Sequence, residues 1–396
     1  MGAKFWGMGR NYYFCEIFYS IMSIEIRQIQ PTKAELKKFV EFATNLYNGN
    51  PFYVPSLLMD DINTLNPKKN AAFEFCESVY FMAYKDVKAV GRIAGIINRV
   101  VNEKYNEQAA RFGWFDFEND WEISEGLMNA VMQWAREKGM TKLVGPLGFT
   151  DMDPEGMLVE GFDQVSTMAT IYNFQYYVNH IERLGFAPEN DWVEFKVYVP
   201  DEIPEKMVRI SEIVKKKYEL RTITPPSRRW FVRNYGQAMF EVINEAYKDF
   251  YGYSTLTPKQ IKQYIGMYVP ILRLDMVSLI LDKNDKLVGV GISLPSMSQA
   301  LIKNRGRIFP FGWLDLVKAW RKNTIGDLRL VAVLPEYQNK GVNALLFTHL
   351  IPHYQKNGYV YFETNPELEV NTSVQKQWMY FHTEQHKRRR AFSIEL

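Results

Sequence analysis

Cysteine is almost absent from this chain, which has two in 396 residues, Cys15 and Cys76. Two cysteines do not make a disulfide framework and are compatible with a reducing compartment, so we expect a cytoplasmic protein. The sequence also lacks any apolar run close to the roughly 18 residues that a membrane-spanning helix needs. These absences argue against a secreted disulfide-rich domain and against a membrane-spanning protein.

An excess of charge of either sign is also missing. The 48 Lys and Arg residues nearly balance the 45 Asp and Glu residues, which leaves a net charge of +3. Binding to nucleic acid or to an anionic membrane usually needs a basic excess, so this balance predicts neither partner. The length is too great for one ordinary hydrophobic core and predicts two domains; the oligomeric state has no signature in the sequence.

The first 22 residues are aromatic and contain Lys4 and Arg10, which raises the question of a signal peptide. Glu16 interrupts the apolar part, and no small-residue cleavage site follows. The alternative is that Met22 is the physiological start and that residues 1–22 are an N-terminal extension. We favour this alternative, because residues 23–29 alternate apolar and polar side chains as a first strand does.

The most informative stretch is residues 328–346, which read LRLVAVLPEYQNKGVNALL. A β-branched and leucine-rich run of strand length stops at Pro335, which cannot donate to a sheet ladder. A polar turn containing Gly341 follows, and a helix opens near Ala344. The first amides of such a helix point outward without intrahelical partners, so the pattern predicts a site for a phosphate group.

Five residues of this stretch match a known motif: Val333, Pro335, Tyr337, Gln338 and Gly341. They resemble the acyl-CoA-binding motif of the GNAT (GCN5-related N-acetyltransferase) superfamily, V-x-P-x-[YF] followed by [QR]-x-x-G-x-[GA]. Asn343 stands at the last small-residue place and departs from the motif. The alternative is an ordinary strand-turn-helix connection of another α/β protein.

The resemblance implies acetyl-CoA or another acyl-CoA as co-substrate, with no metal. It also implies a set of cofactor-binding residues: Val331, Val333, Gln338, Asn339, Lys340, Gly341, Val342, Asn343 and Ala344.

The same order of elements occurs twice along the chain. Strand, helix, three antiparallel strands, helix and strand follow one another over residues 23–200, and the order repeats with insertions over 201–396. We therefore expect an α+β protein of two tandem GNAT-like acyl-CoA N-acyltransferase folds, each a mixed sheet flanked by helices. In the first copy, residues 116–122 contain four carboxylates and no glycine, so we expect this copy not to bind CoA.

Several individual elements can be predicted within these copies. A long amphipathic helix is expected over residues 229–250, and a helix over 372–381. Residues 145–162 are rich in glycine and aromatic residues and either line a pocket or form a structured loop. Residues 296–323 interrupt the second copy and are a candidate lid or substrate-specific insertion.

The resemblance implies direct attack of an amine on the thioester, with a general base and a tyrosine that protonates the thiolate. The acceptor would be a small-molecule or peptide amine. Glu363 and Asp327 are the best-placed candidate bases, although the interpretation of each as an ordinary surface carboxylate or cap is favoured. The usual acid position of the motif N-x-x-A-x-x-x-Y holds Trp378, and Tyr380 lies two residues on. Either Tyr380 substitutes, another tyrosine does, or the protein is not a catalyst.

Three further patterns are weighed and set aside. His349 and His353, like His382 and His386, are four residues apart, but nothing else supports a metal site. The basic run over residues 387–390 is expected to be a solvated edge. Residues 303–322 contain several basic residues and tryptophans. They could form a binding patch for nucleic acid or for an acidic substrate, but we expect the ordinary mixed surface of a loop.

Two functions from different classes remain. The first is an acyl-CoA-dependent N-acyltransferase, and the alternative is a non-catalytic tandem GNAT-like protein that binds a small molecule. Release of a free thiol from acetyl-CoA in the presence of amines distinguishes them.

Overall fold

The computed structural model describes residues 24–371 and 375–396. The predictions for the N-terminal extension, for Cys15 and for residues 372–374 of the expected last helix lie outside the described residues. No helix among the described residues is both long and apolar enough to cross a membrane.

In the described residues, 14 strands form one continuous sheet. The strands of the first half are β1 (Ile24–Gln28), β2 (Cys76–Lys85), β3 (Lys88–Asn98), β4 (Ala109–Phe117), β5 (Lys142–Gly145), β6 (Met157–Glu160) and β7 (Ala187–Tyr198). Those of the second half are β8 (Arg221–Ile223), β9 (Val277–Leu281), β10 (Leu287–Pro295), β11 (Ile325–Val333), β12 (Tyr361–Thr364), β13 (Glu367–Leu368) and β14 (Thr383–Glu395).

Their spatial order is β1-β2-β3-β4-β5-β14-β7-β12-β11-β10-β9-β8. Only β4 with β5 and β11 with β12 pair in parallel; the other strand pairs of the described residues are antiparallel.

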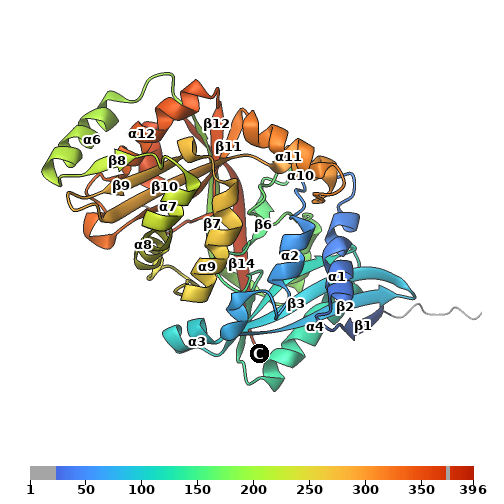
Figure 1. Cartoon of the computed structure of the whole chain (residues 1–396). Coiled ribbons are helices and arrows are strands. Elements are labelled where there is room, and N and C mark those ends of the chain that lie inside the picture. Colours follow the sequence, from blue (N-terminus) through green and yellow to red (C-terminus); the bar gives the residue numbers. More distant parts are fainter. Residues whose placement is uncertain (1–23, 372–374) are drawn as a thin grey trace, which may run out of the picture.

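The last strands of the two halves are exchanged at the centre of the sheet (Figure 1). Strand β14, from the end of the chain, pairs with β5 of the first half, and β7 of the first half pairs with β12 of the second. The two final strands also pair with each other over almost their whole length. Each half is therefore completed by hydrogen bonds from the other, which explains why the sheet has no break between the two copies.

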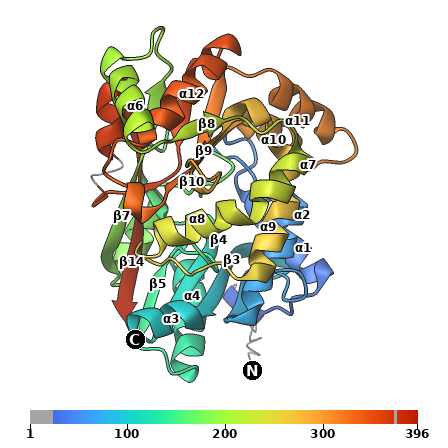
Figure 2. The same cartoon turned by 60° about the vertical axis from the view of Figure 1, so that its left-hand side comes forward.

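Helices connect the strands and cover both faces of the sheet (Figures 1 and 2). In the first half they are α1 (Lys33–Leu46), α2 (Leu58–Thr64), α3 (Arg99–Tyr105), α4 (Trp121–Glu137) and α5 (Tyr176–Arg183). In the second half they are α6 (Glu205–Lys217), α7 (Arg228–Phe231), α8 (Gln237–Tyr247), α9 (Pro258–Tyr268), α10 (Ser298–Asn304), α11 (Gly312–Arg321) and α12 (Asn343–Lys356). Helices α4 and α12 each join the two parallel strands of their half, as parallel pairing requires.

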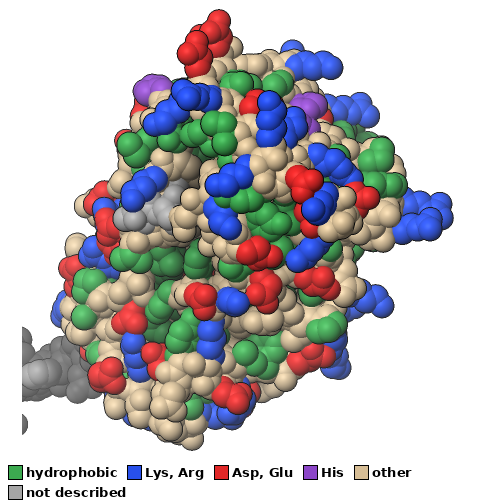
Figure 3. Space-filling view, turned by 90° about the vertical axis from the view of Figure 1, so that its left-hand side faces the viewer, with side chains coloured by type: hydrophobic (Ala, Val, Ile, Leu, Met, Phe, Trp, Pro, Cys, Tyr) green, Lys and Arg blue, Asp and Glu red, His purple; other side chains and the backbone are tan. Residues whose placement is uncertain are grey.

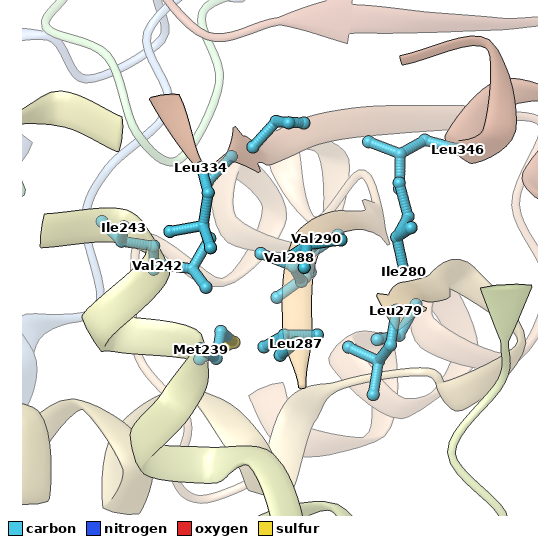
Figure 4. Packing of buried hydrophobic residues seen from close by; sticks show 14 of the residues in the cluster. Met239, Val242, Ile243, Leu279, Ile280, Leu287, Val288, Val290, Leu334 and Leu346 are labelled. Atoms are coloured by element: carbon cyan, nitrogen blue, oxygen red, sulfur yellow. The ribbon is translucent and has the colours of Figure 1, made fainter. Parts of the chain in front are cut away.

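Side chains of α8 illustrate how the second half is packed (Figure 4). Met239, Val242 and Ile243 recur at helical spacing and are buried. They belong to one apolar cluster with Val288 and Val290 of β10. Burial of each such side chain stabilises the fold by about 1.5–3 kcal/mol, so this packing fixes α8 against the sheet beside β11.

The long helix expected over residues 229–250 is interrupted. A π-helical turn, Val232–Gly236, separates α7 from α8, and α8 ends at Tyr247. The Asn234 side chain donates a hydrogen bond to the carbonyl of Trp230, 2.8 Å away. In a regular helix this carbonyl would accept a hydrogen bond from the backbone amide of residue 234. This competition between side chain and backbone accounts for the break.

The expected solvated edge at residues 387–390 is wrong. These residues lie in β14, an inner strand, and Lys387 and Arg389 are almost completely buried. A single sequence shows the alternation of a strand but not which neighbours it acquires, and here the neighbours come from a distant part of the chain. The expected helix over 372–381 is also different: its described part is a short 3-10 helix, Lys376–Tyr380.

Candidate active site

The turn between β11 and α12 is built from the residues of the sequence motif. A 3-10 turn, Pro335–Tyr337, ends the strand, and the Gln338 side chain donates a hydrogen bond to the carbonyl of Val333, 2.9 Å away. Asn339 and Gly341 both have positive φ, 58° and 78°. No hydrogen bond of the described residues uses the backbone amides of Asn339, Lys340 or Gly341. These amides are therefore free to bind an anion.

Helix α6 lies directly over this turn. A Cβ atom built on Gly341 would stand 2.8 Å from Cγ2 of Ile210 in α6. Glycine is thus required here for its positive φ and for close packing. Asn343, the residue that departs from the motif, begins α12 and donates from its side chain to Oε1 of Gln377, 3.1 Å away. This hydrogen bond ties the Asn343 side chain to the 3-10 helix Lys376–Tyr380.

Strands β11 and β12 separate beside the turn. They pair in parallel from Ile325 to Leu328, opposite Tyr361 to Thr364, and then diverge. Beyond the last pair, the Asn365 side chain donates to the carbonyl of Arg329 at 2.7 Å, and the Tyr247 hydroxyl donates to the carbonyl of Val331 at 2.9 Å. Beyond Leu328, the edge of β11 that faced β12 therefore pairs with no strand of the described residues.

A cavity of about 730 Å³ occupies this gap and extends towards the first half of the chain. Eight of the nine predicted cofactor residues line it; the exception is Lys340, whose ammonium lies 5.4 Å from the ring centre of Tyr218. Its apolar wall includes Met207, Ile210, Met239, Phe240, Ile243 and Phe347. Figure 3 shows one face of the molecule, on which hydrophobic side chains lie in a central hollow with charged side chains around it.

Three carboxylates from the first half reach the same cavity. Asp151, Asp153 and Glu155 lie in the loop between β5 and β6, and all three line the cavity. Burial raises the pKa of Asp151 to about 7, that of Asp153 to about 6 and that of Glu155 to about 8. Asp153 accepts the backbone amide of Thr150, whereas Oδ1 of Asp151 is buried without a hydrogen-bond partner among the described residues. A buried carboxylate with a pKa near neutrality suits general-base chemistry or the binding of an ammonium group.

The structure separates the three predicted catalytic residues. Tyr380 lines the cavity, and the ammonium of Lys206 lies 5.1 Å from its ring centre. Asp327 and Glu363 pair across β11 and β12, are buried, and do not line the cavity. Burial raises the pKa of Asp327 to about 7. The catalytic roles of these three residues are predictions.

Glu363 belongs to a buried ionic cluster at the exchanged strands. The Lys387 ammonium lies 2.8 Å from Glu363 and 3.4 Å from Glu194, and Arg389 also forms an ion pair with Glu194. Glu194, Glu363 and His386 place ligand-type atoms within 4.8 Å of one another. Two cationic side chains already neutralise the two carboxylates, so this donor set does not need a metal ion.

The residue at the usual acid position has a structural role. Trp378 is buried, and its Nε1 lies 3.0 and 3.1 Å from the two carboxylate oxygens of Glu367. Burial raises the pKa of Glu367, which also lines the cavity, to about 7. The indole therefore positions a carboxylate on the cavity wall.

In the corresponding turn of the first half, side chains lie across the start of α4. Asp120 caps α4, its Oδ1 accepting the amide of Glu122 at 3.1 Å. Asp116 is buried in an ion pair with Arg92, and the His180 ring bonds both Ser124 and Asn119 across the start of the helix. Carboxylates and a histidine thus occupy the place that is open in the second half.

Sequence reasoning missed the acidic side chains of the cavity. The loop containing Asp151 and Glu155 was recognised only as a possible pocket wall, from its glycine and aromatic content. Tyr247, Tyr264 and Tyr268 on α8 and α9 also line the cavity. No sequence pattern singled out these three tyrosines, and only the packing of α8 against β11 and of α9 against α8 places them at the site.

Comparison with known proteins agrees with this geometry. Residues 237–373 match the family model described as acetyltransferase (GNAT) family. The chain is 25% identical over 373 residues to Protein YghO of Escherichia coli, covering 92% of this chain and 94% of that protein. It is 27% identical over 299 residues to the bacterial ceramide synthase of Caulobacter vibrioides, covering 74% of this chain and 76% of that protein.

A solved structure supports the arrangement of the whole chain. A tandem GNAT protein from the clavulanic acid biosynthesis pathway superposes with a TM-score of 0.53 at 12% identity, covering 94% of this chain and 98% of that one. This likeness concerns the fold, including the presence of two copies. The chain therefore has the fold of two tandem GNAT-like copies, and residues 237–373, in its second half, match the GNAT family model.

Proposed function

We propose that the protein transfers an acyl group from acyl-CoA to the primary amine of an acceptor bound between the two halves. The observation that carries this proposal is the continuity of the cavity: it begins at the open turn before α12, follows the free edge of β11, and ends at the acidic loop of the first half. The turn suits the pyrophosphate of CoA, and the strand edge suits its extended pantetheine arm. The thioester would then lie near the divergence of β11 and β12, facing the carboxylates.

We further propose that the acceptor is an amine with a long hydrocarbon chain. Part of the cavity wall is apolar, although carboxylates, Arg329, Lys376 and several amide side chains also line the cavity. An apolar wall binds a hydrocarbon chain by removing it from water. The relative from Caulobacter vibrioides is a ceramide synthase, and ceramides are N-acyl derivatives of long-chain amino alcohols. A polar amine head would lie at Asp151 and Glu155, with its chain along the apolar wall.

The reaction needs one bond formed and one broken. The amine nitrogen attacks the thioester carbonyl carbon, a C–N bond forms, and the C–S bond breaks with release of the CoA thiolate. A base must take a proton from the nitrogen, and an acid must protonate the sulfur. We assign the base to Asp151, whose unbonded oxygen lies at the cavity and whose pKa is near neutrality, and the acid to Tyr380. Glu363 and Asp327 remain the alternative bases.

The test is a matrix of donors and acceptors followed by release of free CoA thiol. Acetyl-CoA and palmitoyl-CoA are each combined with sphinganine, with a short alkylamine and with no amine. We expect thiol release that depends on the amine and is fastest with sphinganine. Faster reaction with the short alkylamine would reject the long-chain acceptor but retain N-acyl transfer. Binding of acyl-CoA by calorimetry without amine-dependent release from any pair would reject catalysis in favour of the non-catalytic binding protein.

A further inference from the structure

Helices α10 and α11 form an insertion between β10 and β11 that lies at the edge of the molecule in both views (Figures 1 and 2). Its inner side is anchored to the first half. Arg305 donates to Oδ1 of Asn45 at 2.8 Å, Arg307 forms an ion pair with Glu41 at 2.9 Å, and the amide of Leu58 donates to the carbonyl of Gly306 at 3.1 Å. These contacts hold the insertion in a fixed position against α1 and α2.

The outer side of the insertion exposes large apolar side chains. Phe309 is 79% exposed and Phe311 is 71% exposed in the loop before α11, and in α11 itself the exposed fractions are 46% for Trp313, 48% for Leu314 and 38% for Val317. Single exposed apolar residues are common, but five within nine positions form a patch. We call these five residues the apolar patch.

Three exposed cations adjoin the apolar patch. Lys318, Arg321 and Lys322 lie at the end of α11, and none of them forms an ion pair with another described residue. The nearest acid in sequence, Asp315, is already paired with Lys303 at 2.7 Å. At about 100° per residue, Trp313, Val317 and Arg321 follow one another on the same side of α11, with Leu314 and Lys318 beside them.

We propose that this outer side of α11 and its preceding loop is a docking surface for an anionic phospholipid membrane. Phe and Trp side chains favour the boundary between acyl chains and headgroups, and lysine and arginine at the margin favour anionic headgroups. The local charge supports a membrane over an apolar protein partner, because all three adjoining unpaired charges are positive. The near-neutral net charge of the chain predicted no membrane partner. A net charge does not show how charges are distributed, and here three unpaired cations lie together beside the apolar patch.

The docking surface also lies close to the cavity. Trp320 of α11 donates from Nε1 to the carbonyl of Ile271 at 2.9 Å. Val269 and Leu272, which lie within two positions of Ile271 in the chain, line the cavity. A membrane-bound molecule would therefore present this wall of the cavity towards the bilayer. The docking surface does not depend on the proposed catalytic function, and the two can fail separately.

The experiment measures sedimentation of the full chain with sucrose-loaded vesicles. Anionic vesicles, in which about 30% of the lipid is phosphatidylglycerol and the rest is phosphatidylcholine, are compared with vesicles of pure phosphatidylcholine. We expect binding to the anionic vesicles that is at least about tenfold stronger than to the neutral ones and weakens with added salt. Absence of binding to the anionic vesicles would overturn the proposal.

Two variants and matched controls locate the contact. Phe309→Ser/Phe311→Ser and Lys318→Gln/Arg321→Gln/Lys322→Gln should each weaken binding at least about tenfold. Their controls are Val87→Ser/Ile213→Ser, at two other exposed apolar positions, and Arg209→Gln/Lys216→Gln/Lys356→Gln, which removes the same charge from α6 and α12. Equal vesicle binding by the variants and the parent would overturn the proposal. The proposal would also be overturned if the parent formed a dimer that Phe309→Ser/Phe311→Ser abolished while vesicle binding stayed the same.

Discussion

Individual carboxylates of the cavity illustrate how burial prepares a side chain for proton transfer. Asp151 and Glu155 come from the first half of the chain; burial raises the pKa of both, and the charge of Asp151 raises that of Glu155 further. A base with a pKa near 7 is both deprotonated often enough and basic enough to act at neutral pH. These two residues thus link the half without an open phosphate turn to the chemistry of the other half.

Asp151→Asn should lower kcat by about 100-fold or more, with little change in KM for acyl-CoA, because the base is lost but the acyl-CoA surface is not. Parent activity should rise with pH through about 7, where Asp151 loses its proton, and the variant should lack this rise. The measurement is steady-state thiol release between pH 5.5 and 8.5. Glu363→Gln and Asp327→Asn are the matched comparisons away from the cavity; loss of activity in either of them, with Asp151→Asn still active, would reassign the base.

Tyr380→Phe tests the acid. It should lower kcat by about 100-fold with little change in KM, because only the hydroxyl that protonates the thiolate is removed. Tyr268→Phe, another tyrosine on the cavity wall, is the control and should retain activity. The reverse result would show that a different tyrosine acts as the acid, an alternative that was open from the sequence.

At the scale of single elements, the turn before α12 depends on a side chain that spans it. Gln338 bonds the carbonyl of Val333 and so holds the strand end against the turn, while Ile210 of α6 lies beside Gly341. A substitution at Gly341 would disturb α6 as well as the phosphate site, since Ile210 leaves no room for a Cβ atom. Gln338 therefore offers the cleaner test of this element.

Gln338→Ala should destabilise the protein by about 1 kcal/mol, the typical net contribution of one hydrogen bond, and should weaken acyl-CoA binding because the free amides of the turn are no longer held in place. Calorimetric titration with acyl-CoA, alongside thermal unfolding, measures both effects. Gln133→Ala, on the exposed face of α4 where its side chain bonds Glu137, is the control. Unchanged affinity in Gln338→Ala would mean that CoA does not bind through this turn.

At the scale of the whole molecule, the exchanged strands place charge inside the sheet. Lys387 and Arg389 of β14 meet Glu194 of β7 and Glu363 of β12, and the four charges balance. Removing one partner from a buried ion pair leaves an uncompensated charge, at a cost of about 3–5 kcal/mol. The junction therefore selects one register of β14 between β5 and β7.

His386 makes this junction sensitive to pH. Burial, together with Lys387, Lys196 and Arg389, lowers its pKa to about 2, although Glu363 lies 3.6 Å from Nε2. Below an unfolded-state pKa of about 6.5 the unfolded chain takes up a proton that the folded chain does not, so stability should fall as pH falls from about 6.5. At pH 5.5 the loss from this group is about 1.4 kcal/mol.

Urea unfolding at pH 7.5 and 5.5 measures this effect. His386→Gln should reduce the difference in unfolding free energy between the two pH values by about 1.4 kcal/mol, whereas His382→Gln, at an exposed position of the same segment, should leave it unchanged. An identical pH dependence in the parent and in His386→Gln would show that the imidazole is not held neutral in the folded protein.

Local chemistry in the sequence was sufficient for the elements and for the turn before α12. Proline at the strand end, glycine at a positive φ and the apolar helix behind them describe a strand, a turn and a helix that form from neighbouring residues alone. The two copies were visible for the same reason, because helical and strand periodicity recur in the same order. Thr257 and Gln260, three residues apart, likewise form a capping box at the start of α9 from neighbouring residues alone.

Tertiary structure decided the features that depend on distant partners. The exchange of β7 and β14 buries a basic run that by itself resembles a solvated edge, because one compensating acid, Glu194, lies almost 200 residues away and the other, Glu363, comes from a different strand. The cavity likewise combines a turn of the second half with carboxylates of the first, and their raised pKa values arise from burial that no local pattern reveals. Sequence thus determined which local structures can form, and packing between the halves determined which side chains meet, since periodicity encodes faces but not neighbours.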